Sequence, residues 1–262
     1  MTFVLIAAAL YLVAAALLMR RVARGQEPGA VAWAAPASAA VLAHAFYHVL
    51  AWREVGGADM HFFSAVSLVA LGMAILTLAV GLRGRMGALG VIVFPLAALA
   101  VAIYARVPHV GHEALDWRLQ LHAWCALLAY ATLAVAALLA VLLWMQERAL
   151  RRREFHRWLR ALPPLTVMES LLFRTIGVGF VLLSATLLTG ILFVHDFFAQ
   201  HLIHKTVLSI LSWLVFGALL VGRWRYGWRG ARAIGWTLTA MALLVLAFFG
   251  SKFVLELVLQ RA

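Results

Sequence analysis

The chain has 262 residues, of which 66% are hydrophobic and only 12% are charged. Soluble domains carry about 25% charged residues, so this composition indicates a multi-pass membrane protein, and at about 20 residues per span the length leaves no room for a sizeable soluble domain. The net charge of +12 comes from cations spread over several loops, which argues against nucleic acid as a partner and for a membrane topology.

Eight apolar runs, separated by turn residues and arginines, follow one another along the chain. Their continuous Ala- and Leu-rich character favours helices over the alternating pattern of a membrane β-barrel. We therefore predict one all-α membrane domain, 1–262, built as a bundle of about eight transmembrane helices. The first run lacks a basic leading segment and a clear cleavage site, so we expect a retained helix and not a signal peptide. The runs are 3–19, 31–52, 62–82, 86–105, 120–145, 170–195, 203–222 and 231–254.

Arginines mark alternate loops, and cation-rich loops stay in the cytoplasm. We therefore expect both termini on the outer, periplasmic side of a bacterial inner membrane. The longest inner loop, 146–169, combines basic and aromatic residues, which predicts an amphipathic segment on the anionic inner leaflet. The marked loops hold Arg20, Arg21, Arg24, Arg83, Arg85, Arg148, Arg151, Arg152, Arg153, Arg157, Arg160, Arg223, Arg225, Arg229 and Arg232.

On this topology nine of the ten histidines lie on the outer side. Histidine in or near hydrocarbon usually finds a polar partner or a ligand, and neutral imidazole binds both metal ions and haem iron. We therefore expect a ligand site on the outer face. The outer histidines are His44, His48, His61, His109, His112, His122, His195, His201 and His204.

Two arrangements of these histidines remain open. His44 and His48 are four residues apart on one helix face, so they can hold one zinc or copper ion but cannot take both axial positions of one haem. Axial ligands must come from different elements, and His122 is suited to this role because Ala126 and Ala129 follow it on the same face and allow close packing.

Other chemistry finds no support in the sequence. Cys125 is the only cysteine, which excludes an intrachain disulfide, a CxxC relay and an iron–sulfur site. There is no P-loop, no dinucleotide-binding glycine motif and no serine nucleophile elbow. We predict no catalytic residue.

Two parts of the chain resemble the cytochrome c assembly protein family. LHAW at 121–124, followed by LAYA at 128–131, is similar to the start of a helix in the CcsA, ResC and HemX-like members. Residues 190–213 and the basic segment 223–230 resemble the outer haem-handling segment and the inner loop that follows it. AQHLIHKTVLS and FGSKFVLE are most similar to the short YpjD-like inner-membrane proteins. The resemblance implies haem export or presentation for cytochrome c maturation, with maturation proteins as partners.

The departures from the family bear on the expected haem site. Residues 195–206 replace the tryptophan-rich motif WGxxWxWDPKET and keep Lys205 and Thr206, and Trp213 follows. His122 stands where the family has an outer histidine, but the second outer histidine and a membrane-embedded one have no counterpart. A haem here would need His122 and a second ligand. The predicted cofactor-binding residues are His122, His201, His204, His195, His48, His44, Lys205 and Trp213.

Three functions remain open at this point. The leading one is a haem-binding accessory protein of cytochrome c biogenesis that uses axial ligation and an aromatic cradle. The second is a structural or regulatory membrane protein that keeps the fold without handling haem. The third is a zinc or copper binding or transport protein that uses His44 and His48.

Overall fold

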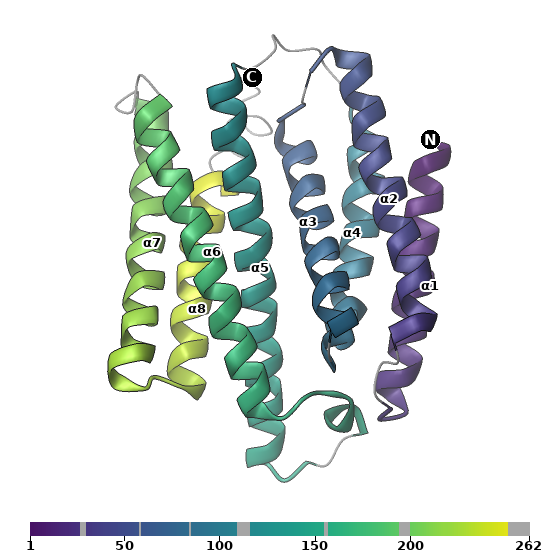
Figure 1. Ribbon diagram of the computed structural model, residues 1–262, viewed down its shortest axis with the longest axis vertical. Helices are drawn as coiled ribbons and strands as arrows, with labels where there is room; N and C mark the ends of the chain where they lie inside the picture. Colours follow the sequence, from purple (N-terminus) through teal and green to yellow (C-terminus); the bar gives the residue numbers. More distant parts are fainter. Residues whose placement is uncertain are drawn as a thin grey trace. The chain divides into compact units, whose positions relative to one another are not determined.

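The computed structural model describes residues 1–26, 30–57, 59–83, 85–108, 116–154, 157–193 and 200–250 (Figure 1). This described part contains helices and no strand, and eight of its helices are long and apolar enough to cross a membrane. The predicted all-α fold is thereby confirmed. The helices are α1 (Thr2–Ala23), α2 (Ala30–Val55), α3 (Phe62–Arg83), α4 (Gly90–Tyr104), α5 (Trp117–Arg151), α6 (Leu165–Phe193), α7 (Gln200–Tyr226) and α8 (Gly230–Val245). Three short turns complete them: the 3-10 turns η1 (Arg85–Leu89) and η2 (Arg157–Ala161) and the π-helical turn η3 (Leu246–Gly250).

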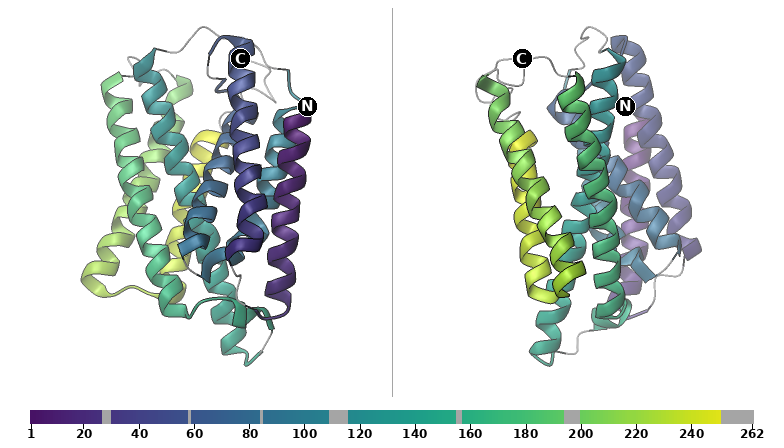
Figure 2. Two further views of the ribbon diagram at one scale, coloured as in Figure 1. Left: turned by 45° about the vertical axis from the view of Figure 1, so that its right-hand side comes forward. Right: turned by 60° about the vertical axis from the view of Figure 1, so that its left-hand side comes forward.

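The chain divides into two compact units. Unit 1 comprises Met1–Ala114 and Arg148–Pro164, and unit 2 comprises Leu115–Glu147 and Leu165–Ala262. In unit 1, α1 packs against α2 and α4, and α3 packs against the same two helices (Figure 2). The rings of Tyr11, Phe94 and Trp33 follow one another through its core, with centroid separations of 5.8 and 6.1 Å. All three side chains are buried.

In unit 2, α7 packs against both α6 and α8. Small residues permit close approach between its helices, as is common in membrane bundles. A Cβ placed on Gly179 of α6 would lie 2.5 Å from the Leu133 side chain of α5, so this glycine lets the two helices touch. At the turn into α8, Trp228 packs on Gly222 in the same way, and Gly227 adopts a φ of +65° that closes the turn.

Candidate functional site

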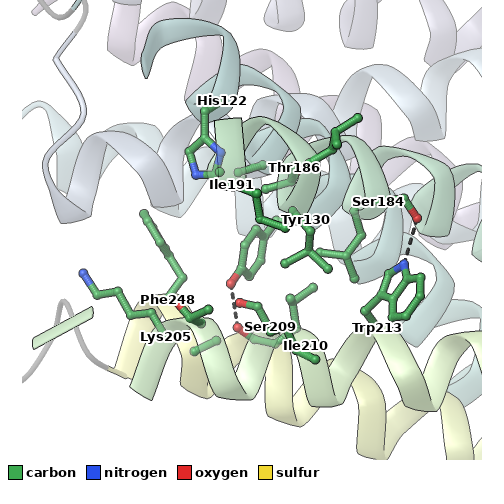
Figure 3. Close-up of a pocket in the computed structure, with 18 residues that line it drawn as sticks. His122, Tyr130, Ser184, Thr186, Ile191, Lys205, Ser209, Ile210, Trp213 and Phe248 are labelled. Carbon is green, nitrogen blue, oxygen red and sulfur yellow. Dashed lines mark hydrogen bonds between the residues drawn. The ribbon is translucent and has the colours of Figure 1, made fainter. Parts of the chain in front are cut away.

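Unit 2 contains a pocket of about 620 Å³, within the usual range for small-molecule and cofactor sites, lined by α5, α6, α7, α8 and η3 (Figure 3). Its walls are mostly apolar. A small number of polar side chains interrupts them, which is the typical composition of a site that orients a large apolar ligand. The polar and aromatic lining residues are His122, Tyr130, Ser184, Thr186, Lys205, Thr206, Ser209, Trp213 and Phe248.

Helix α5 supplies one edge of the pocket through residues spaced by four. His122, Ala126 and Tyr130 therefore lie on one helix face and line the pocket together. Ala126 leaves space between the two rings. The Tyr130 hydroxyl donates a hydrogen bond to the Leu244 carbonyl at 2.6 Å, which holds the ring as a wall of the pocket close to the change from α8 to η3.

The His122 imidazole is held by α6. Its Nδ1 lies 3.2 Å from the Thr189 hydroxyl, and that hydroxyl already donates its single proton to the carbonyls of Ala185 and Thr186, at 2.8 and 3.0 Å. In the tautomer that carries its proton on Nδ1, the imidazole donates to this hydroxyl and Nε2 keeps its lone pair. A hydrogen bond that fixes one ring nitrogen is the usual support of a metal-binding histidine.

Gly190 gives the imidazole its space. A Cβ on this residue would lie 3.3 Å from Cε1 of His122, so a larger side chain would press on the ring. Thr189 thus offers a hydrogen-bond partner to the imidazole, and Gly190 leaves the space that the ring occupies. Neither carried a signal in the sequence that could link it to His122.

Trp213 closes the other end of the pocket. Its Nε1 donates to Ser184 Oγ at 2.8 Å, and its ring stacks on Phe180 with centroids 5.4 Å apart. Both partners belong to α6, so Trp213 joins α7 to α6 at this level. Figure 3 shows His122 and Lys205 at one end of the pocket and Trp213 with Ser184 at the opposite end.

The structure brings three of the predicted site residues to this pocket: His122, Lys205 and Trp213. His195 lies outside the described residues. His201 and His204 lie in the first turns of α7, where the description is confined to the backbone. Sequence reasoning missed Tyr130, whose spacing of eight residues from His122 on one helix was the available signal.

His44 and His48 belong to unit 1, where both contact one serine. Nε2 of His44 lies 2.9 Å and Nε2 of His48 lies 3.0 Å from Ser67 Oγ, and Nδ1 of His44 lies 3.3 Å from the Tyr11 hydroxyl. The two rings stack with centroids 5.4 Å apart. All four side chains are buried. Because a serine hydroxyl has one proton, it can donate to only one imidazole and must accept from the other.

Asp59 and His61, in the loop between α2 and α3, form a polar contact at the end of unit 1. Asp59 Oδ1 pairs with His61 Nδ1 and accepts the His61 backbone N–H, and its Oδ2 accepts the Tyr104 hydroxyl. Burial acts to raise the pKa of the Asp59 carboxyl, but the hydrogen bonds from His61 and Tyr104 outweigh it and hold the pKa below its usual value.

A metal site with several protein ligands is not formed in the described ranges. No group of three or more His, Cys, Asp or Glu side chains there is placed to hold a metal ion. His44 and His48 share one face, as their spacing predicts, but no third ligand of these types joins them. Their hydrogen bonds with Ser67 and Tyr11 account for their burial without a metal.

The fold and the pocket define a class of protein: a multi-pass membrane protein with a large, mostly apolar site beside a buried histidine. A family model described as "Cytochrome C assembly protein" matches residues 30–259. The chain therefore belongs to the cytochrome c assembly protein family. Membership supports a role in cytochrome c biogenesis in the inner membrane.

Individual relatives agree with this assignment. "Inner membrane protein YpjD" of Escherichia coli (strain K12) is 32% identical over 204 residues, which cover 77% of each chain. An "Uncharacterized 28.8 kDa protein in nifR3-like 5'region" of Azospirillum brasilense is 35% identical over 161 residues, covering 61% of this chain and 59% of that protein. No solved structure matches the chain.

Proposed function

We propose that the pocket of unit 2 binds haem non-covalently, with His122 as an axial ligand, in the service of cytochrome c maturation. The observation that carries the proposal is the state of His122. Its Nδ1 is engaged by Thr189 and its ring lines a pocket of about 620 Å³ that is large and apolar enough for a cofactor. An imidazole whose Nδ1 donates a hydrogen bond presents the lone pair of Nε2 to a metal ion.

The remaining residues that line the pocket suit both the flat aromatic ring of haem and its propionate carboxylates. Tyr130, Trp213 and Phe248 offer ring faces and edges to a flat aromatic ligand. Lys205 lines the pocket at the same end as His122, and an ammonium group there complements the carboxylates of haem propionates. Trp213 is fixed by Ser184 and Phe180, so this wall is already ordered.

When bound, haem would supply an iron for ligation by imidazole nitrogen. The residues that would hold it are His122 and one of His195, His201 and His204, which precede Lys205 by at most ten residues in the sequence. His44 and His48 are not assigned this role, because both of their Nε2 atoms are used with Ser67. Proteins of cytochrome c maturation are the proposed partners that would receive the haem.

Absorption spectroscopy of the detergent-purified protein tests this function. Titration with haem should give a red-shifted Soret band in the wild type, and His122→Gly should lose it. Added imidazole should restore the band in His122→Gly, because free imidazole can occupy the space left by the side chain. His61→Gln, which changes a histidine of unit 1, is the matched control and should bind as the wild type does.

Two outcomes contradict the proposal. If the wild type shows no spectral change with haem, the chain keeps the family fold without handling haem. If His122→Gly and the wild type bind equally, then haem binds elsewhere or without His122.

A further inference from the structure

The pocket of unit 2 has a side that faces outward between α6 and α7. Leu188 and Ile191 of α6 and Ile210 of α7 all line the pocket, yet they are 58%, 68% and 42% exposed. Residues that line a pocket while remaining this exposed lie at its mouth. We refer to Leu188, Ile191 and Ile210 as the lateral mouth.

The lateral mouth lies within membrane-spanning segments. The span of α6 covers Leu165–Phe193 and that of α7 covers Lys205–Tyr226, so the three mouth residues belong to segments long and apolar enough to cross a membrane. All three side chains are large aliphatic groups, which suit contact with lipid. An aqueous opening at this depth would instead be expected to carry polar side chains.

Trp213 limits the lateral mouth at the end of the pocket opposite His122 and Lys205. Its hydrogen bond to Ser184 and its stacking on Phe180 tie α7 to α6 at that level, so the two helices cannot separate there without breaking these contacts. The open stretch therefore lies between this joint and the end of the pocket that holds His122 and Lys205 (Figure 3).

The pocket is chemically graded along its length. The end with Lys205 and His122 carries an ammonium group and an imidazole, whereas the opposite end is bounded by the Trp213 ring. A flat amphiphile lying in a bilayer, with its anionic groups toward the headgroups and its apolar part toward the centre, has the same grading.

We propose that this pocket takes up its ligand sideways from the bilayer, through the lateral mouth. The ligand class is a membrane-dissolved flat amphiphile with anionic groups that pair with Lys205. Its identification as haem rests on the proposed function, but the existence of the lateral mouth does not. Lipid acyl chains reach Trp213 through the same opening when no ligand is bound.

Quenching by brominated lipid tests the mouth without any haem. The protein has ten tryptophans, so the difference in emission between wild type and Trp213→Phe isolates Trp213. In vesicles of phosphatidylcholine brominated at mid-chain, the Trp213 component should be strongly quenched. Ile191→Phe should reduce that quenching by filling the mouth. A Trp213 component that is not quenched overturns the proposal.

Haem transfer tests the route itself. Haem dissolved in vesicles that contain the protein should bind about tenfold more slowly in Ile191→Trp than in wild type, equivalent to ~1.4 kcal/mol on the barrier. Val181→Trp is the matched control, because Val181 is a 66% exposed residue of α6 that does not line the pocket. Equal rates in the wild type and both variants, with binding intact, overturn lateral uptake. If none of the proteins binds haem, the proposed function fails. The quenching of Trp213 then still shows whether the pocket opens to the bilayer.

Discussion

Replacing Ser67 by alanine tests how the buried histidines of unit 1 are satisfied. Ser67 Oγ is the partner of Nε2 in both His44 and His48, at 2.9 and 3.0 Å. These side chains are 0% and 1% exposed, and Ser67 is 0% exposed. Water therefore cannot replace the lost hydroxyl without opening the helix packing, and both imidazoles lose this hydrogen bond at once.

The expected loss follows from the number of bonds. Hydrogen bonds between membrane helices contribute about 0.6 kcal/mol on average and at most about 1.7, and a buried polar group that loses its partner costs about 1–3 kcal/mol. For two bonds we expect Ser67→Ala to lower the free energy of unfolding by about 1–3 kcal/mol. SDS titration of the protein in detergent micelles, followed by circular dichroism, measures this difference.

A matched control separates the network from the loss of any hydroxyl. Thr175 of α6 donates only to the carbonyl of Leu171, four residues earlier in the same helix, so Thr175→Ala should change stability by less than about 0.5 kcal/mol. A result for Ser67→Ala within the same limit would refute the reasoning, because the histidines would then not depend on the shared serine. Nitrogen-15 NMR adds a second check: in the wild type, Nε2 of at least one of the two imidazoles should carry a proton.

Three further predictions concern other parts of the chain. Lys205→Glu should weaken haem binding by at least about tenfold in a spectral titration, since a like charge would face the propionates, whereas Lys205→Arg should bind like the wild type. Gly179→Ala should destabilise unit 2 by about 1–3 kcal/mol in SDS titration, because its Cβ would lie 2.5 Å from a leucine of α5, and Gly177→Ala, which has nothing within 4 Å, should not. The contacts with His61 keep the pKa of Asp59 lower in the folded protein than in the unfolded chain, so their contribution to stability should be complete above about pH 3.9, the pKa of the unfolded carboxyl. This contribution should be lost as the pH falls through the lower pKa of the folded state. Asp59→Asn should abolish that acid dependence in thermal unfolding, and an unchanged dependence would assign it to other carboxyl groups.

Hydropathy was sufficient to predict the eight spanning helices, since apolar runs of this length in a membrane leave the backbone no other structure. Helix ends were less predictable. Helix α5 continues to Arg151, although its apolar run ends near residue 145. Charged residues at 147, 148 and 151 do not prevent a helix from continuing beyond the hydrocarbon, because they are good helix formers. Hydropathy therefore marks the membrane boundary and not the end of the helix.

Features of the predicted site that depend on spacing within one helix could be predicted from the sequence, whereas contacts between helices could not. The spacing of His44 and His48 predicts one helix face, and their stacked rings lie on one. The shared partner Ser67 belongs to α3, and no spacing within α2 points to it. Similarly, Ala126 beside His122 predicts close packing, but the acceptor Thr189 comes from α6, 67 residues away. Contacts between helices depend on rotation and register, which the pattern of one helix does not specify.

The use of a buried histidine depends on how many of its ring nitrogens the protein already engages. His44 is fully buried and has both engaged, by Tyr11 and Ser67, so its imidazole can take a ligand only after a hydrogen bond is broken. His122 has its Nδ1 engaged by Thr189 and lies at the edge of a pocket. The same residue type in the same membrane is therefore structural in unit 1 and suited to a ligand in unit 2. Exchanging these roles would require moving Ser67 as well as the histidines, so the number of histidines in the chain does not by itself locate a ligand site.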